Sequence, residues 1–129
     1  MWQRESIDSE GFSHENPIPV ASRIGPYLAT GALTGKDPET GEMPSDLDTQ
    51  VKNVFDHIHR VMAAAGGTPE DILKITVYLA EYRQRSALNA AWLEMFPDPS
   101  SRPARHVIAA SLDRGALIQA DLFAILQDS

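Results

Sequence analysis

One helical stripe limits what this chain can fold into more than any other feature of its sequence. Apolar residues recur at steps of three and four between residues 47 and 65, namely Leu47, Val51, Val54, Ile58, Val61, Met62 and Ala65. Polar residues of the same stretch fall on the other side of the helix, namely Lys52, Asn53, Asp56 and Arg60. A helix with one apolar side must cover another apolar surface, so the stripe predicts a layered fold.

The ends of this predicted helix carry the usual signals. Ser45 stands at the N-cap position, and Asp46 and Asp48 lie in the first turn, where negative charge favours the helix dipole. Gly66-Gly67 is expected to end the helix.

A strand that could supply the apolar surface under this helix is predicted a few residues later in the sequence. Residues 72–79 read Ile-Leu-Lys-Ile-Thr-Val-Tyr-Leu, a β-branched, aromatic and nearly alternating run that is typical of a central strand. Thr68-Pro69-Glu70-Asp71 predicts one short helical turn before this strand.

The remaining elements complete a two-layer α+β domain. Strands are expected at residues 2–7, 20–24 and 27–33, the last two joined by a hairpin turn at Gly25-Pro26. A second helix is expected over residues 85–96, where Leu88, Trp92 and Phe96 repeat at helical spacing and Pro97 ends the pattern. Runs at residues 106–112 and 116–126 predict a closing hairpin. The order β-β-β-α-β-α-β-β predicts a mixed sheet with two helices on one face, in a single domain over residues 1–129.

Composition limits the classes of function. The net charge of −7 repels nucleic acid, because binding a phosphate backbone depends on clustered lysine and arginine. The chain has no cysteine, and no stretch has the apolar length of a signal sequence or membrane span, so a cytoplasmic protein is expected. His57 and His59 are two residues apart on the predicted helix and do not face the same way, and we therefore expect no metal site and surface or half-buried histidines.

Arg105 is the residue that most directly suggests binding chemistry. In Ser101-Arg102-Pro103-Ala104-Arg105-His106 it stands at the head of a predicted strand, just after a proline that stiffens the approach. The fixed fork of N–H donors in a guanidinium matches a carboxylate. Arg105 is therefore expected either to bind a carboxylate ligand or to pair with an acidic side chain of its own chain or of a neighbouring chain.

Several segments stand out in order along the chain, namely Asp37-Pro38-Glu39-Thr40-Gly41, Asp71 to Leu79, Leu88-Asn89-Ala90-Ala91-Trp92 and Pro103-Ala104-Arg105. Together they resemble the RidA/YjgF family, also described as endoribonuclease L-PSP or translation inhibitor. The resemblance implies a homotrimer of chorismate-mutase-like subunits with a central barrel of strands. It also implies ligand clefts between adjacent subunits, where enamines and imines such as 2-aminoacrylate are hydrolysed to 2-keto acids and ammonia without a metal or cofactor.

The resemblance assigns roles to individual residues. The carboxylate-binding arginine of the family matches Arg105, and its helix asparagine matches Asn89. The glutamate credited with positioning water or moving protons matches Gln119, an amide that cannot act as a general acid or base. Asp121 lies two residues further along the same strand, hence on the same face, but is one methylene shorter than the family's glutamate there.

Further positions depart from the family pattern. The family often has a cysteine two residues after the arginine, where this chain has Val107. The family's tyrosine in the N-terminal loop matches Ile18, and its Ser-Gly-Gln of the hairpin matches Gly31-Ala32-Leu33. The sequence therefore supports two hypotheses: a deaminase-type hydrolase with Arg105, Gln119 and Asp121 as catalytic residues, and a non-catalytic metabolite-binding or regulatory trimer. Ribonuclease activity is suggested only by the family's older name, and the acidic balance argues against it.

Overall fold

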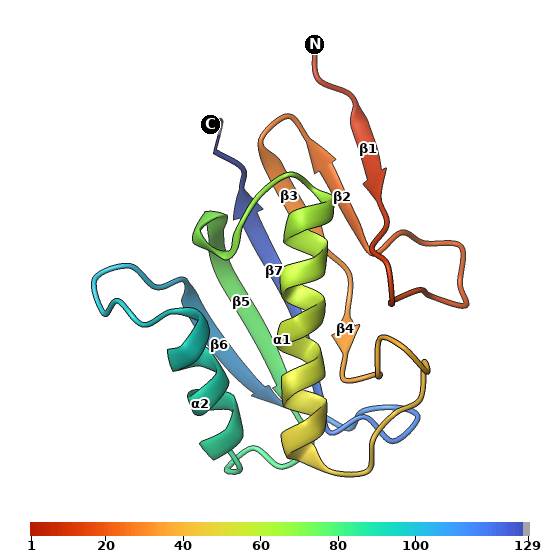
Figure 1. The fold of residues 1–129 in the computed structure, drawn as a ribbon, viewed down its shortest axis with the longest axis vertical. Helices are drawn as coiled ribbons and strands as arrows, with labels where there is room; N and C mark the ends of the chain where they lie inside the picture. Colours follow the sequence, from red (N-terminus) through yellow and green to blue (C-terminus); the bar gives the residue numbers. More distant parts are fainter. Residues whose placement is uncertain (128–129) are drawn as a thin grey trace.

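A computed structural model describes residues 1–127 as one sheet covered on one face by two helices (Figure 1). The strands are β1 (Arg4–Ile7), β2 (Ala21–Ile24), β3 (Tyr27–Thr30), β4 (Leu33–Thr34), β5 (Ile72–Leu79), β6 (Ala104–Ala109) and β7 (Ile118–Ile125). The helices are α1 (Leu47–Ala64) and α2 (Ser86–Met95), and a short 3-10 turn, η1 (Pro69–Asp71), precedes β5.

The sheet is mixed, with strand order β1-β2-β3-β7-β5-β6, and β4 pairs with β7 beyond the end of β3. β5 and β6 run parallel because the chain crosses over through α2 between them, whereas the other pairs are antiparallel. Strand residues that face the helices are buried, as in β5, where Ile75, Val77 and Leu79 are almost completely inaccessible. The predicted α+β class, with one mixed sheet and two helices, is confirmed.

The predicted closing hairpin is wrong. β6 pairs with β5 alone, and β7 lies on the other side of β5, between it and β3. The connection passes the end of β5, where Ala110 N–H donates to the Leu79 carbonyl and Ala80 N–H donates to the Leu117 carbonyl. The parallel crossover places β6 along one edge of β5. β7 pairs with the other edge of β5, where it forms its longest antiparallel ladder.

The hairpin at Gly25-Pro26 is confirmed, since Ile24 lies opposite Tyr27 across β2 and β3. Gly25 has a φ of +58°, and the Trp2 ring packs so closely that a Cβ at this position would overlap it. The predicted strand over residues 27–33, however, is divided at Gly31 and Ala32 into β3 and the two-residue β4.

Helix α1 buries a wider surface than its apolar stripe predicts. The stripe is confirmed, but Asn53 and His57, which the sequence places on the polar or surface side, are also buried. Both bind the loop after β4: Asn53 Nδ2 donates to the Gly35 carbonyl at 2.9 Å, and His57 Nε2 lies 2.7 Å from the Lys36 carbonyl oxygen. Burial lowers the pKa of His57. The N-cap is Asp46, whose carboxylate accepts from Thr49 N–H, and not Ser45.

Gln50 joins this row of polar residues and binds three backbone groups. Its amide nitrogen donates to the Pro44 and Gly115 carbonyls at 2.7 and 3.0 Å, and its amide oxygen accepts from Leu117 N–H at 2.8 Å. Since Gln50 is fully buried, Gln50→Ala would leave these groups unpaired and is expected to lower the free energy of unfolding by about 3 kcal/mol. Urea unfolding of this variant and of a control at the exposed Gln84 (Gln84→Ala) tests this; equal stabilities would contradict it.

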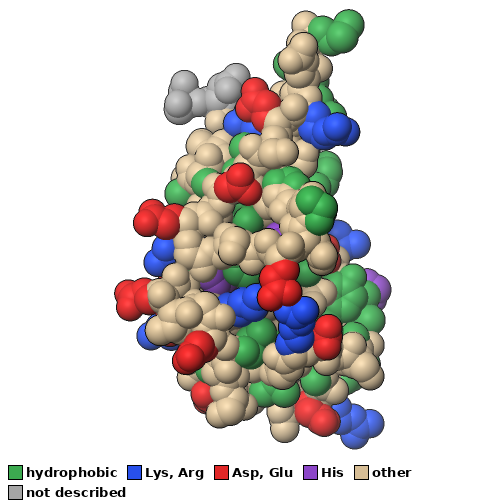
Figure 2. All heavy atoms as spheres, turned by 90° about the vertical axis from the view of Figure 1, so that its right-hand side faces the viewer, with side chains coloured by type: hydrophobic (Ala, Val, Ile, Leu, Met, Phe, Trp, Pro, Cys, Tyr) green, Lys and Arg blue, Asp and Glu red, His purple; other side chains and the backbone are tan. Residues whose placement is uncertain are grey.

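The surface carries charges of both signs. On the face in Figure 2, lysine and arginine side chains lie among aspartate and glutamate side chains, without a broad region of one sign. Neither helix within residues 1–127 has the length and apolar character needed to cross a membrane.

Candidate functional site

Arg105 lies near the start of β6, which is an edge strand of the sheet. It stands opposite Ile75 of β5, and Ile75 faces the helix layer, so the side chain of Arg105 leaves the sheet on the helix side. There the guanidinium carbon lies 5.0 Å from the centre of the Trp92 ring in α2. Trp92 is buried, and its ring supplies the surface on which the guanidinium rests.

The guanidinium is partly buried without an acidic partner. Within residues 1–127 it forms no salt bridge, and its Nη1 is a buried nitrogen without a hydrogen-bond acceptor. Burial, and secondarily the positive charge of Arg85, lowers the pKa of Arg105, although a guanidinium remains charged. The alternative that Arg105 pairs with a carboxylate of its own chain is therefore not what the structure shows.

Asn89 and Val107 belong to the two elements, α2 and β6, that carry Trp92 and Arg105. Asn89 is exposed on α2, three residues before Trp92 and hence on the neighbouring part of the helix surface. Val107 is two residues after Arg105 on β6, on the same side of the sheet, and packs against the core. We refer to Arg105, Val107, Asn89 and Trp92 as the arginine edge.

Gln119 and Asp121 lie on the opposite face of the sheet. In β7 they stand opposite Tyr78 and Thr76, which alternate with the helix-facing residues of β5. Burial raises the pKa of Asp121, with Lys74 acting in the other direction. Within one chain, Arg105 and Val107 thus lie on one face of the sheet, and Gln119 and Asp121 lie on the other.

Gln119 lies in a hollow of about 310 Å³, which we call the Gln119 hollow. It is lined by Phe12, Ser13, His14, Glu15, Asn16, Ala32, Thr34, Lys36, Asp113, Arg114 and Gln119. Two of its lining residues carry buried polar atoms that find no hydrogen-bond partner within residues 1–127, namely His14 Nε2 and Thr34 Oγ1. Unsatisfied groups of this kind commonly mark positions where water or a ligand binds.

Ile18 and Gly31 lie beside this hollow. Gly31 N–H donates to the Val20 carbonyl, and Gly31 precedes Ala32, which lines the hollow. Ile18 is exposed in the preceding loop, where its N–H donates to the carbonyl of Asn16, another lining residue. Asp121 is not among the lining residues.

Sequence reasoning left open whether His14 can reach the ligand, and it did not point to Thr34. The pairing of Thr34 with Gln119 between β4 and β7 places these two residues side by side, and no local pattern predicts that pairing. His14 belongs to the irregular segment between β1 and β2, where spacing gives no information on position.

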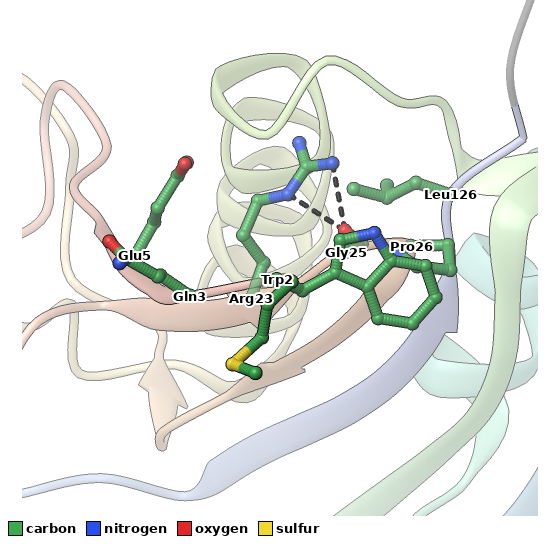
Figure 3. A pocket seen from close by; sticks show the side chains of 8 residues that line it. Trp2, Gln3, Glu5, Arg23, Gly25, Pro26 and Leu126 are labelled. Carbon is green, nitrogen blue, oxygen red and sulfur yellow. Dashed lines mark hydrogen bonds between the residues drawn. The ribbon is translucent and has the colours of Figure 1, made fainter.

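A second hollow, near the N-terminus, contains a guanidinium that already has acceptors (Figure 3). Its cation, Arg23, donates to the Gly25 carbonyl from two nitrogens at 3.1 and 2.9 Å and to the Ala65 carbonyl at 2.9 Å. This guanidinium therefore stabilises the β2–β3 turn and the end of α1. Within residues 1–127, no three histidine or acidic side chains come together in a way that would hold a metal ion.

Comparisons with known proteins agree with this arrangement of elements. The family model described as Endoribonuclease L-PSP matches residues 18–126. A RutC family protein from Pyrococcus abyssi is 30% identical over 120 residues, which cover 88% of this chain and 93% of the relative. The 2-iminobutanoate/2-iminopropanoate deaminase of Escherichia coli is 27% identical over 104 residues, covering 79% of this chain and 81% of the enzyme.

Solved structures show the same fold. A protein of the Rid family from Yersinia pestis superposes with a TM-score of 0.89 at 24% identity, covering 96% of this chain and all of that one. The Escherichia coli protein TdcF, with bound serine, gives 0.87 at 20% identity, covering 95% of this chain and 99% of that one. From the match to the family model over most of its length, the chain belongs to the RidA/YjgF family, that of endoribonuclease L-PSP.

Proposed function

We propose that this protein is a homotrimer with the chorismate-mutase-like assembly expected from its family, and that it hydrolyses a small imine or enamine carrying a carboxylate. The observation that carries the proposal is the partly buried guanidinium of Arg105, which has no acidic partner within residues 1–127. The Escherichia coli relative named 2-iminobutanoate/2-iminopropanoate deaminase supports the reaction class.

A carboxylate is the ligand that best matches Arg105. The buried Nη1 needs an acceptor, and an anionic acceptor also offsets the desolvation that lowers the pKa of this arginine. The Trp92 ring holds the guanidinium from one side, so its remaining donors are available to a ligand. TdcF with bound serine is a family-fold protein that holds a small molecule with such a carboxylate.

The position of the two residue groups favours a cleft between chains. The arginine edge is on the helix side of the sheet, and the Gln119 hollow involves the opposite side. A small molecule cannot reach both through one sheet, but the arginine edge of one subunit and the hollow of its neighbour can face each other. In this arrangement Arg105 holds the carboxylate, and the amide of Gln119 orients water by hydrogen bonding.

The test is a turnover assay. An amino-acid oxidase or a dehydratase generates the imine in the reaction mixture. Release of ammonia or 2-keto acid is then followed with and without the protein. Acceleration that wild type shows and Arg105→Ala loses supports the proposal. Equal rates for the two proteins across several imines would refute it.

The second candidate, a metabolite-binding trimer without turnover, is favoured by one observation: the family glutamate is the amide Gln119. A thermal-shift screen with 2-keto acids and amino acids separates the two functions. Saturable stabilisation that depends on Arg105, without loss of substrate, would identify a binding protein.

Trimerisation is a prediction of its own. Ile24, Tyr27 and Phe123 are 44%, 48% and 40% exposed on the uncovered face of the sheet, so one chain leaves an apolar surface in water. Sedimentation equilibrium at micromolar concentration is expected to give about three times the chain mass of 14.1 kDa. A species with the mass of one chain would contradict the trimer.

A further inference from the structure

We propose that His14 is the proton-transferring residue of the Gln119 hollow and performs the general acid–base step that Gln119 cannot perform. The inference rests on the proposed function, because it names the group that moves protons during hydrolysis of the imine. It concerns a residue of the irregular segment between β1 and β2.

His14 lies where such a group is needed. It lines the hollow together with Gln119, and its Nε2 is buried without a hydrogen-bond partner within residues 1–127. The same nitrogen is 3.9 Å from the position that a Cβ on Gly31 would occupy, so it reaches the loop between β3 and β4. Thr34 Oγ1, a second buried atom of this hollow without a partner within residues 1–127, belongs to the residue paired with Gln119.

The imidazole is held by packing. The His14 ring meets the Phe12 ring edge-on, with 5.2 Å between centroids and 86° between planes. Phe12 is buried, and its ring also packs against the His57 ring, with 4.8 Å between centroids. His57 Nε2 in turn forms a hydrogen bond with the Lys36 carbonyl oxygen. These contacts restrict the position of the imidazole in the hollow.

The hydrolysis requires a group that gains and loses a proton. Water adds to the carbon of the C=N bond, and one of its protons passes through the imidazole to the nitrogen, which gives a carbinolamine. The hydroxyl proton of the carbinolamine then passes through the imidazole to the nitrogen as the C–N bond breaks, and the 2-keto acid and ammonia are released. An amide cannot take part in this exchange, whereas an imidazole nitrogen can both accept and donate a proton. Gln119 orients the water, and His14 moves the proton.

The charges around His14 come from several segments. Glu15, Lys36, Asp113 and Arg114 line the hollow with it, and Arg114 Nη1 forms a 2.8 Å salt bridge with Glu15. Glu15 and Asp113 oppose Lys36 and Arg114 in sign, so the hollow contains two acidic and two basic side chains beside the histidine. His57 is the titratable group on the far side of Phe12.

The experiment compares His14→Gln with His59→Gln, a control on the exposed side of α1, in the imine-hydrolysis assay across pH. His14→Gln is expected to lower kcat by about 10²-fold and to change the dependence of kcat on pH, with little change in KM. The double variant His14→Gln, Gln119→Glu is expected to recover part of the rate, because it restores a proton-transferring group. Circular dichroism and thermal unfolding verify that each variant is folded.

The outcomes separate this inference from the proposed function. Turnover that needs Arg105 but keeps its rate and pH profile in His14→Gln overturns the role of His14 and leaves the function intact. A matching loss in Asp121→Asn, without one in His14→Gln, assigns the step to Asp121. Lack of turnover by wild type overturns both. As an independent readout, the NMR signal of the His14 ring is expected to shift on addition of 2-oxobutanoate in wild type and not in Arg105→Ala.

Discussion

Replacing Arg105 with alanine is expected to weaken binding of a 2-keto acid or amino-acid ligand by about 10²- to 10³-fold. A guanidinium that donates two charge-assisted hydrogen bonds to a carboxylate contributes about 3–4 kcal/mol to binding, and this range corresponds to that loss. Arg105→Lys is expected to recover only part of the affinity, because an ammonium group lacks the planar fork. Isothermal titration calorimetry with 2-oxobutanoate measures both variants.

Two measurements exclude indirect causes. Arg83 is exposed in the connection before α2, and Arg83→Ala removes the same charge from the molecule without touching the arginine edge. It is expected to bind as wild type does. The stability of Arg105→Ala is expected to be unchanged or slightly higher, since the substitution removes a partly buried cation without a partner. Equal affinity of Arg105→Ala and wild type would show that this arginine is not the anchor.

Local patterns predict the fold well where an element carries its own signal. The stripe from Leu47 to Ala65 and the alternating run from Ile72 to Leu79 define α1 and β5 closely, because burial on one side requires just these spacings. The same logic misses Gln50, Asn53 and His57. Their burial depends on loop carbonyls that reach α1 from distant segments.

Strand pairing is the part of the fold that local patterns do not determine. The runs that became β6 and β7 are adjacent in sequence, and a turn-forming Asp113-Arg114-Gly115 lies between them, so a hairpin was the local prediction. The structure instead places β5 between them, because its two edges supply one parallel and one antiparallel ladder. Which strands become neighbours is decided by contacts across the whole sheet and not by the local sequence.

The candidate site also has features that the sequence predicts and features that it does not. The chemistry of Arg105 is readable from the sequence, since few residue types bind a carboxylate with a planar fork of donors. The separation of Arg105 from Gln119 across the sheet follows from pairing, and His14 reaches the hollow through an irregular segment. Both facts needed the structure.

Mixing two inactive variants is expected to restore activity, because the two parts of the site belong to different subunits in the proposed trimer. Arg105→Ala removes the arginine edge, and Ala32→Phe fills the Gln119 hollow with a larger side chain. When the two are unfolded together and refolded in equal amounts, about one quarter of the clefts combine an intact arginine with an intact hollow. The imine-hydrolysis rate is expected to rise from background to about one quarter of the wild-type rate.

A matched mixture makes the result decisive. Wild type refolded with an equal amount of the double variant Arg105→Ala, Ala32→Phe yields about one quarter of intact clefts if each cleft uses two chains, and about one half if each chain carries a whole site. The same two models predict one quarter and zero for the mixture of single variants. About one half of the wild-type rate in the mixture of wild type with the double variant, together with no activity in the mixture of the two single variants, would place Arg105 and the Gln119 hollow in the same subunit's site. This result would refute the shared cleft.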